Sequence, residues 1–126
     1  MNKLRQVKPE VRRLSAVEAE VWIRIEADAV TPTTDVRGRL VGPCCPGATT
    51  VEVAFPLQPL PRQPPDMPLL SRRVHIPDPS LWDPERPFVY HAVIELWQDG
   101  KRCDVAEFDY GLTMSRAPAP PPKGGA

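Results

Sequence analysis

The chain has 126 residues, which allows one compact domain and excludes a large catalytic barrel of about 200 residues or more. Sixteen Lys and Arg residues balance sixteen Asp and Glu residues, so the formal net charge is zero and nothing global attracts nucleic acid or an anionic membrane. The hydrophobic fraction of 41% suits a single core, whereas the 18 prolines disfavour long helices.

The chain shows no pattern of a targeting or membrane segment. Its basic N-terminus is not followed by the apolar run of about 7–15 residues that a secretory signal requires. Charges or prolines interrupt every hydrophobic run well before the roughly 20 residues of a membrane span. We therefore expect a soluble, cytoplasmic protein.

Hydrophobic alternation predicts strands rather than helices. Between 17 and 27 every second residue is apolar, which is the period of a half-buried strand, although the spacing of Ser15 and Glu18 also resembles a helix capping box. The β-branched residues of this run favour the strand. Similar short runs at 36–41, 49–55 and 71–76, each bounded by turn residues, have the spacing of a β-sandwich.

A proline-rich stretch at 56–68 contains six prolines, which exclude a regular strand there. We expect it to form an extended surface connection between the sheets. Residues 59–62 read Pro-Leu-Pro-Arg and only partly resemble a PxxP ligand of an SH3 domain, so the connecting role is preferred.

The clearest local signal is the pair Asp99-Gly100, because a two-residue type I′ turn requires two residues that tolerate positive φ. Counting outward from this turn predicts a hairpin from Phe88 to Tyr110 in which Trp97 lies opposite Arg102. The inward-facing residues of the first strand are then Phe88, Tyr90, Ala92, Ile94 and Leu96.

The returning strand of this hairpin changes its apolar phase. Cys103 and Val105 share the inward face, but the next apolar residues are Ala106, Phe108 and Tyr110. A β-bulge near Val105–Ala106 would explain the change, and it would place Ala92 opposite Phe108 and Tyr90 opposite Tyr110.

The ten residues at 81–90 read Leu-Trp-Asp-Pro-Glu-Arg-Pro-Phe-Val-Tyr, followed by the alternating strand, the Asp-Gly turn and Asp104. This order resembles the immunoglobulin-like β-sandwich module of glycoside hydrolase family 2, which carries a Leu-Trp-x-Pro-Glu-x-Pro-x-x-Tyr stretch. The structural motif consists of Leu81, Trp82, Pro84, Pro87, Tyr90, Asp99, Gly100 and Gly111. The prolines stiffen a crossing between sheets, and Trp82 offers a large apolar surface that closes the sandwich edge.

The same resemblance implies that catalysis lies elsewhere. In the family, the module ends at an aromatic-Gly-hydrophobic-Arg sequence that leads into the catalytic barrel. This chain has Tyr110-Gly111-Leu112-Thr113, with threonine in place of arginine, and only a proline-rich segment follows. We predict an all-β, immunoglobulin-like sandwich of about seven antiparallel strands over 1–114, a disordered Pro/Gly-rich tail over 115–126, and no catalytic residue carried over.

The residues themselves point to no catalytic centre. Neighbouring carboxylates, such as Asp83 with Glu85 or Asp104 with Glu107, lie on one loop or strand, whereas glycoside hydrolysis needs two acids about 5–10 Å apart across a cleft. His91 lies on the outward phase of its strand. We interpret it as a surface histidine, because a general base would need an orienting carboxylate and a nucleophile nearby.

Three cysteines, Cys44, Cys45 and Cys103, are an odd number, and adjacent cysteines rarely bridge each other. Together with His75 and His91 they show none of the usual zinc spacings. We expect reduced thiols, no metal and no cofactor, and we assign no role to Cys44 and Cys45.

Two tryptophans are the candidates for binding. Trp22 and Trp97 lie on the outward phases of their strands, where an aromatic ring can stack on a sugar or anchor a protein partner. Trp97 opposite Arg102 also fits an ordinary cross-strand cation–π pair, and we prefer the structural reading of both rings.

The basic residues near the N-terminus fit a solvated strand edge rather than a nucleic-acid site. They are Lys3, Arg5, Lys8, Arg12 and Arg13. The sequence leaves the oligomeric state open.

The sequence thus predicts a non-catalytic sandwich module that acts as a scaffold or protein-interaction domain. Two alternatives remain: a carbohydrate-binding module that uses exposed tryptophans, and an accessory part of a split or truncated glycosidase whose barrel lies on another chain.

Overall fold

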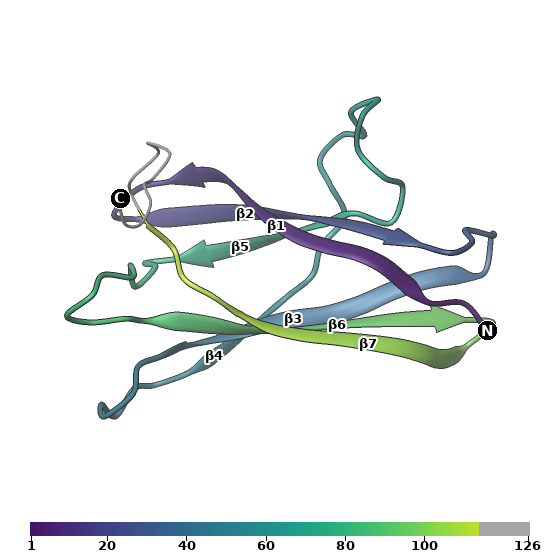
Figure 1. Cartoon of the computed structure of the whole chain (residues 1–126). Helices are drawn as coiled ribbons and strands as arrows, with labels where there is room; N and C mark the ends of the chain where they lie inside the picture. Colours follow the sequence, from purple (N-terminus) through teal and green to yellow (C-terminus); the bar gives the residue numbers. More distant parts are fainter. Residues whose placement is uncertain (114–126) are drawn as a thin grey trace, which may run out of the picture.

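The computed structural model describes residues 1–113, which form two antiparallel β-sheets packed face to face (Figure 1). The strands are β1 (Leu4–Leu14), β2 (Glu18–Ala27), β3 (Thr34–Cys44), β4 (Val53–Pro56), β5 (Arg72–Pro77), β6 (Val89–Gln98) and β7 (Lys101–Tyr110). One sheet has the strand order β1-β2-β5 and the other β4-β3-β6-β7. The all-β sandwich of about seven antiparallel strands is therefore confirmed.

The predicted tail at 115–126 lies outside the described residues. Within the described part of the chain, no helix is long and apolar enough to cross a membrane.

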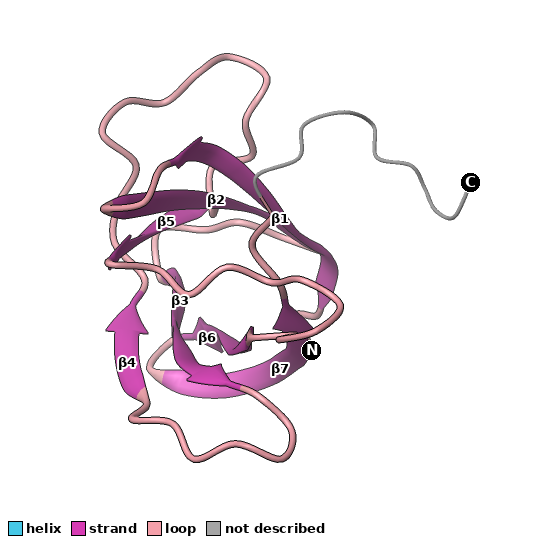
Figure 2. Ribbon diagram, turned by 90° about the vertical axis from the view of Figure 1, so that its left-hand side faces the viewer, coloured by secondary structure: helices cyan, strands magenta, loops and turns pink. Residues whose placement is uncertain are grey.

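The core lies between the two sheets, and Figure 2 shows these two layers of strands in a view along the strands. Alternation along β2 buries Ala19, Val21, Ile23 and Ile25 completely, while the residues between them face outward. The opposite sheet contributes Val36 and Leu40 from β3 and four residues of β6. Tyr90 is the largest of these buried side chains, and its hydroxyl accepts a hydrogen bond of 3.0 Å from the backbone N–H of Ser80.

The turn between β1 and β2 uses the residues that also resemble a helix capping box. The Ser15 hydroxyl accepts hydrogen bonds of 3.2 Å from the N–H groups of Val17 and Glu18, and the Ser15 N–H donates to the carbonyl of Glu18 at 2.9 Å. A serine side chain can satisfy nearby N–H groups in a turn as well as at a helix start. The period of two therefore decides the structure, and β2 begins at Glu18.

The predicted bulge in β7 exists, but its predicted position is wrong. Trp97 pairs with Arg102 as expected, whereas Leu96 pairs with Asp104, so the extra residue is Cys103. Beyond the bulge, Ala92 lies opposite Phe108 and Tyr90 opposite Tyr110, as the sequence predicts.

A contact between the two sheets lies next to the bulge. The Asp104 carboxylate accepts a hydrogen bond of 2.8 Å from the backbone N–H of Leu4 in β1. This bond is also the main cause of the lowered pKa of Asp104. With the bulge at Cys103, Val105 faces outward with 41% of its surface exposed, and the prediction that it faces inward is wrong.

The strand predicted at 49–55 is shorter and later than expected. β4 pairs with β3 only from Val53, opposite Gly42, to Pro56, opposite Arg39. The ladder between β3 and β6 also shifts after Val41, where Pro43 has no N–H to donate. Residues 49–52 therefore lie in the loop beside the sheet.

The proline-rich stretch joins β4 in one sheet to β5 in the other, as predicted, and forms the long loop that rises beside the three-stranded sheet in Figure 1. It contains one isolated bridge, Gln58 with Arg73, and no regular strand. The Arg24 side chain donates to the carbonyl of Asp66 at 2.9 Å, which fixes this loop to the sheet.

The close approach of β3 and β6 generates a stability prediction. A Cβ added at Gly38 would lie 2.1 Å from the carbonyl oxygen of Val93, a backbone atom that cannot move without breaking the ladder. We expect Gly38→Ala to lower the free energy of unfolding by about 3 kcal/mol or more in urea denaturation.

Gly100→Ala is the matched control for this experiment. Gly100 has φ +78° and no atom within 4 Å of an added Cβ, so only the backbone conformation is penalised, by about 1–2 kcal/mol. Equal losses in the two variants would contradict the close packing of β3 on β6.

Candidate functional site

Trp22, one of the two predicted binding residues, is covered. Only 5% of its surface is exposed, in agreement with the structural reading that we preferred for this ring. The Arg12 guanidinium lies 4.4 Å from the ring centroid, and the indole N–H donates to the Glu20 carboxylate at 2.8 Å. Long charged side chains can bury an outward-facing ring in this way without a second layer of structure.

Trp97 lies on the outer face of the other sheet and is half-buried. The cation over its ring is Arg37, at 4.0 Å from the centroid. Arg102 is its register partner, as predicted, but donates instead to the carboxylate of Glu95 at 3.3 Å. The predicted cation–π partner is therefore wrong, because the nearby carboxylate attracts the Arg102 side chain.

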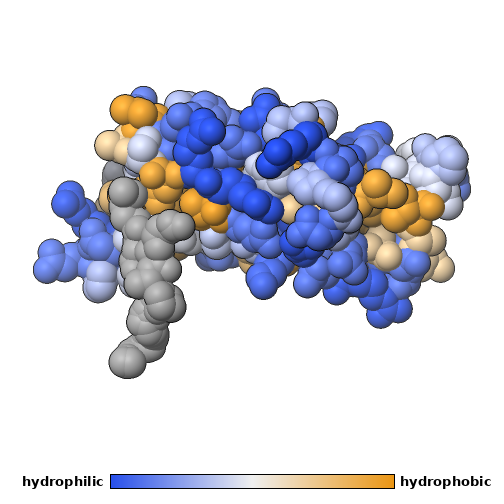
Figure 3. All heavy atoms as spheres, turned by 90° about the horizontal axis from the view of Figure 1, so that it is seen from above, coloured by the Kyte–Doolittle hydropathy of each residue, from blue (hydrophilic) through white to orange (hydrophobic). Residues whose placement is uncertain are grey.

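The two tryptophans belong to different sheets and form no common patch. Figure 3 shows the side of the three-stranded sheet, where hydrophilic residues cover most of the surface and separate the hydrophobic areas. Any binding role of Trp22, Trp97 and Arg102 stays a prediction.

An open groove lies on the outer face of the four-stranded sheet and has a volume of about 620 Å³. It forms where the loop between β3 and β4 lies beside β6 and β7. We call it the outer groove and define it by its lining residues: Arg39, Val41, Cys44, Cys45, Pro46, Ala48, Thr50, Glu52, Val89, His91, Val93 and Asp109.

His91 lies in the outer groove between two carboxylates. Its Nδ1 is 2.9 Å from Oδ1 of Asp109, and its Nε2 is 3.0 Å from Oε1 of Glu107. Both ring nitrogens can donate to these oxygens only when the imidazole is protonated. The hydrogen bonds to Asp109 and Glu107 accordingly raise the pKa of His91.

This cluster is the functional feature that our reading of the sequence missed. We interpreted His91 as lacking an orienting carboxylate, whereas the structure supplies two. The signal was available, because the register that places Tyr90 opposite Tyr110 also places His91 opposite Asp109.

Cys44 lines the outer groove together with His91. Burial and the neighbouring Glu52 carboxylate raise the pKa of Cys44, so the group is a thiol rather than a thiolate near neutral pH. A nucleophilic cysteine needs a lowered pKa. The arrangement therefore does not favour covalent catalysis by Cys44.

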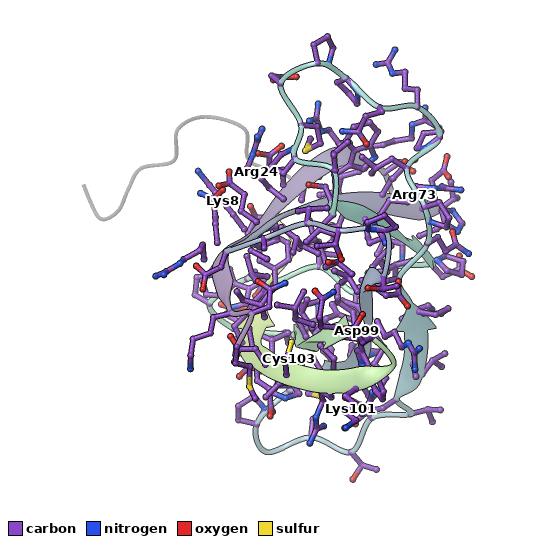
Figure 4. The ribbon with its side chains drawn as sticks, turned by 90° about the vertical axis from the view of Figure 1, so that its right-hand side faces the viewer. Lys8, Arg24, Arg73, Asp99, Lys101 and Cys103 are labelled. Carbon is purple, nitrogen blue, oxygen red and sulfur yellow. The ribbon has the colours of Figure 1, made fainter. Side chains whose placement is uncertain are left out.

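The other cysteines do not complete a reactive or metal-binding set. Cys45 also lines the outer groove, but Cys103 lies between the sheets at the turn end of β7, near Asp99 and Lys101 in Figure 4. All three are free thiols. Among residues 1–113, no three His, Cys, Asp or Glu side chains are grouped in a way that could hold a metal ion.

The carboxylates that we paired from the sequence make separate structural contacts. Asp83 caps its own turn, where its side chain accepts hydrogen bonds of 2.8 Å from the N–H groups of Glu85 and Arg86. Asp104 contacts the other sheet, whereas Glu107 faces outward to His91. Neither pair lies across a cleft.

The motif residues at 81–90 pack in the core or form the turn and bridge next to it. Leu81 packs against the core, Tyr90 is buried in it, and Trp82 forms an isolated bridge with Pro87. Pro84 lies in the turn that Asp83 and Arg86 close by backbone hydrogen bonds.

The remaining motif residues shape the ends of the hairpin. Asp99 and Gly100 have φ values of +54° and +78°, as the predicted turn requires. Gly111 follows the last strand and lies against the Trp82 side chain.

The His91 cluster generates a pH prediction. Because the folded-state pKa of His91 is raised, its stabilising contribution is fully present below the unfolded pKa of about 6.5 and is lost as pH rises through the folded pKa. We expect His91→Gln to destabilise the protein more at pH 6 than at pH 8.5 in urea denaturation. A loss that is equal at both pH values would contradict the two ion-paired hydrogen bonds.

Several solved structures with a similar fold are glycosidases. The chain aligns over 88% of its length with a β-glycosidase from Bacteroides vulgatus (16% identity, TM-score 0.60), a glycosyl hydrolase family 2 member from Bacteroides cellulosilyticus (19%, 0.61) and the Ruminococcus gnavus β-glucuronidase (13%, 0.58). It covers 13%, 14% and 15% of these proteins, respectively. At such identities the likeness shows the fold.

A search of the curated proteins gives no match. The model of one family, glycosyl hydrolases family 2, matches residues 6–112, which is most of the chain. The matched residues coincide with the sandwich, from β1 to the residue after Gly111. The chain therefore belongs to glycosyl hydrolases family 2.

Proposed function

We propose that this sandwich is a non-catalytic scaffold and protein-interaction domain of a glycosidase, which holds associated parts of the enzyme in a fixed orientation. The family match and the fold support a role in glycosidases. The small share of each related structure that the chain covers supports a role as one building block among several.

The observation that carries the proposal is a clamp on the chain where it leaves the last strand. The backbone N–H of Trp82 donates a hydrogen bond of 2.6 Å to the carbonyl of Leu112, whose side chain is completely buried. The Trp82 side chain lies directly over Gly111, so closely that an added Cβ would be 2.9 Å from its Cγ and Cδ1. The segment at 111–112 is therefore fixed to the β5–β6 connection, as a rigid scaffold requires.

The carboxyl groups favour a non-catalytic role. A general acid in glycoside hydrolysis has a raised pKa. The pKa of Glu95 is lowered mainly by the hydrogen bond from Trp97, and that of Asp104 by the bond from Leu4. Asp109 and Glu107 share the cation of His91 on an open sheet face rather than opposing each other across a cleft.

The structure gives less support to carbohydrate binding through tryptophan, because arginine side chains lie over both candidate rings. An accessory role beside a separate catalytic chain remains compatible with the scaffold proposal. The three free thiols are consistent with a reducing compartment, and we propose that the domain works in the cytoplasm.

Hydrolysis assays test the non-catalytic part of the proposal. We expect the purified chain to release no nitrophenol from p-nitrophenyl β-glucuronide, β-galactoside or β-glucoside above the buffer rate. Turnover that follows the protein peak through a second purification step, and that is lost in a variant of any groove carboxylate, would contradict the proposal.

A double-mutant cycle tests the clamp. We expect Gly111→Ala to lower the free energy of unfolding by about 1–3 kcal/mol, because the new methyl group collides with Trp82. In the Trp82→Ala background the same substitution should cost less, since Cγ and Cδ1 are gone and only the Cβ at 3.0 Å remains. Equal costs of Gly111→Ala in both backgrounds, measured in urea, would show that Trp82 does not clamp this segment.

A further inference from the structure

The outer face of the four-stranded sheet has apolar side chains along its middle. Figure 2 shows no further layer of strands over this face within residues 1–113. Val93 of β6 lies half-buried at its centre, with Val41 of β3 and Val105 of β7 as its diagonal neighbours. Apolar side chains that lie next to each other on a sheet face gain stability when another surface covers them.

Charges of opposite sign lie on the two sides of Val93. In the sheet, Val93 is paired with Arg39 of β3 on one side and with Glu107 of β7 on the other. Glu107 and Asp109 share the single imidazole of His91, so the β7 side stays negative in either protonation state of the histidine. The face therefore carries a cation on one side of its apolar centre and an excess of negative charge on the other.

Arg39 has no ion-pair partner within residues 1–113, although its side chain is exposed. The other two arginines of this face are paired, Arg37 with Asp35 at 3.2 Å and Arg102 with Glu95 at 3.3 Å. The charge of Arg39 acts on Glu95 without direct pairing and helps to lower its pKa. The Arg39 guanidinium can therefore pair with a carboxylate of another molecule.

We propose that a second copy of this chain docks on this face, with a two-fold axis that lies between the copies and runs along β6. Rotation about this axis exchanges the two sides of the sheet, so Arg39 of each copy lies over Glu107 of the other. Glu107 uses Oε1 for His91, which leaves Oε2 able to accept from the guanidinium. The two Val93 side chains meet at the axis. This inference rests on the proposed function as an interaction domain and names its partner.

The distribution of charge favours this axis over the alternative. A two-fold axis across the strands would place Arg39 over Arg39 and Glu107 over Glu107, and like charges repel. Packed sheets keep their strand directions within about 30° of each other, and the long arginine side chain still reaches the carboxylate at such an angle. The charged residues of β6 on the chosen axis are balanced within their own chain, because Glu95 pairs with Arg102 and His91 lies between two carboxylates.

Sedimentation velocity of the full chain tests the docking. We expect a monomer–dimer equilibrium between about 5 µM and about 1 mM, the range of a small and partly polar interface. Arg39→Glu and Glu107→Arg, each measured alone, should weaken self-association by about tenfold or more, because two ion pairs become contacts between like charges. An equimolar mixture of the two variants should associate about as tightly as the unchanged chain, since both contacts then join opposite charges again.

Arg86→Glu and Glu85→Arg are the matched controls. They make the same changes of net charge at exposed positions in the β5–β6 connection, outside this face. Both should leave the self-association unchanged. Urea denaturation of each variant checks that it remains folded.

A chain that stays monomeric at about 1 mM would overturn the inference. Association that survives either charge reversal, or that does not return in the mixture, would overturn it as well. These outcomes are distinguishable from failure of the scaffold proposal, because the Trp82–Gly111 cycle and the hydrolysis assays do not depend on contacts of the outer face.

Discussion

The register of β6 is the constraint on which the rest of the structure depends. Tyr90, Ala92, Ile94 and Leu96 face the opposite sheet and are buried, while the residues between them form the centre of the outer face. A slip of one residue would exchange these two sets and move His91 and Glu95 into the core. The turn at Asp99-Gly100 therefore fixes the hydrophobic core and the outer groove at the same time.

The inner and outer faces of the sandwich are stabilised by different interactions. The inner faces exclude water through aliphatic packing, whereas the outer faces keep their aromatic rings covered by paired charges: Arg12 over Trp22 and Arg37 over Trp97. In the outer groove, three valine side chains lie beside two carboxylates, the Arg39 guanidinium and the His91 imidazole.

Much of this structure follows from local sequence rules. The period of two identifies β2, β3, β5 and β6, and the Asp-Gly pair identifies the turn, because both signals depend only on neighbouring residues. The position of the bulge at Cys103 does not follow from them, and beside it Asp104 contacts Leu4, about a hundred residues away in sequence, which no local rule can show.

The candidate site was harder to predict for the same reason. Burial of Trp22 depends on where the Arg12 side chain lies, which alternation does not specify. The loop at 45–52 reaches the outer groove because β4 begins only at Val53, whereas the sequence suggests a strand that begins at residue 49. By contrast, the predicted register already places His91 opposite Asp109, and we did not recognise that this pairing gives the histidine a carboxylate partner.

We infer that the sandwich holds the chain rigidly where it leaves β7, and backbone ¹⁵N relaxation tests this rigidity most directly. The clamp of Trp82 on Gly111 and Leu112 predicts order parameters for these two amides of about 0.85, equal to those of the strands. Values below about 0.6 for the same amides would show a flexible connection and would contradict a scaffold function.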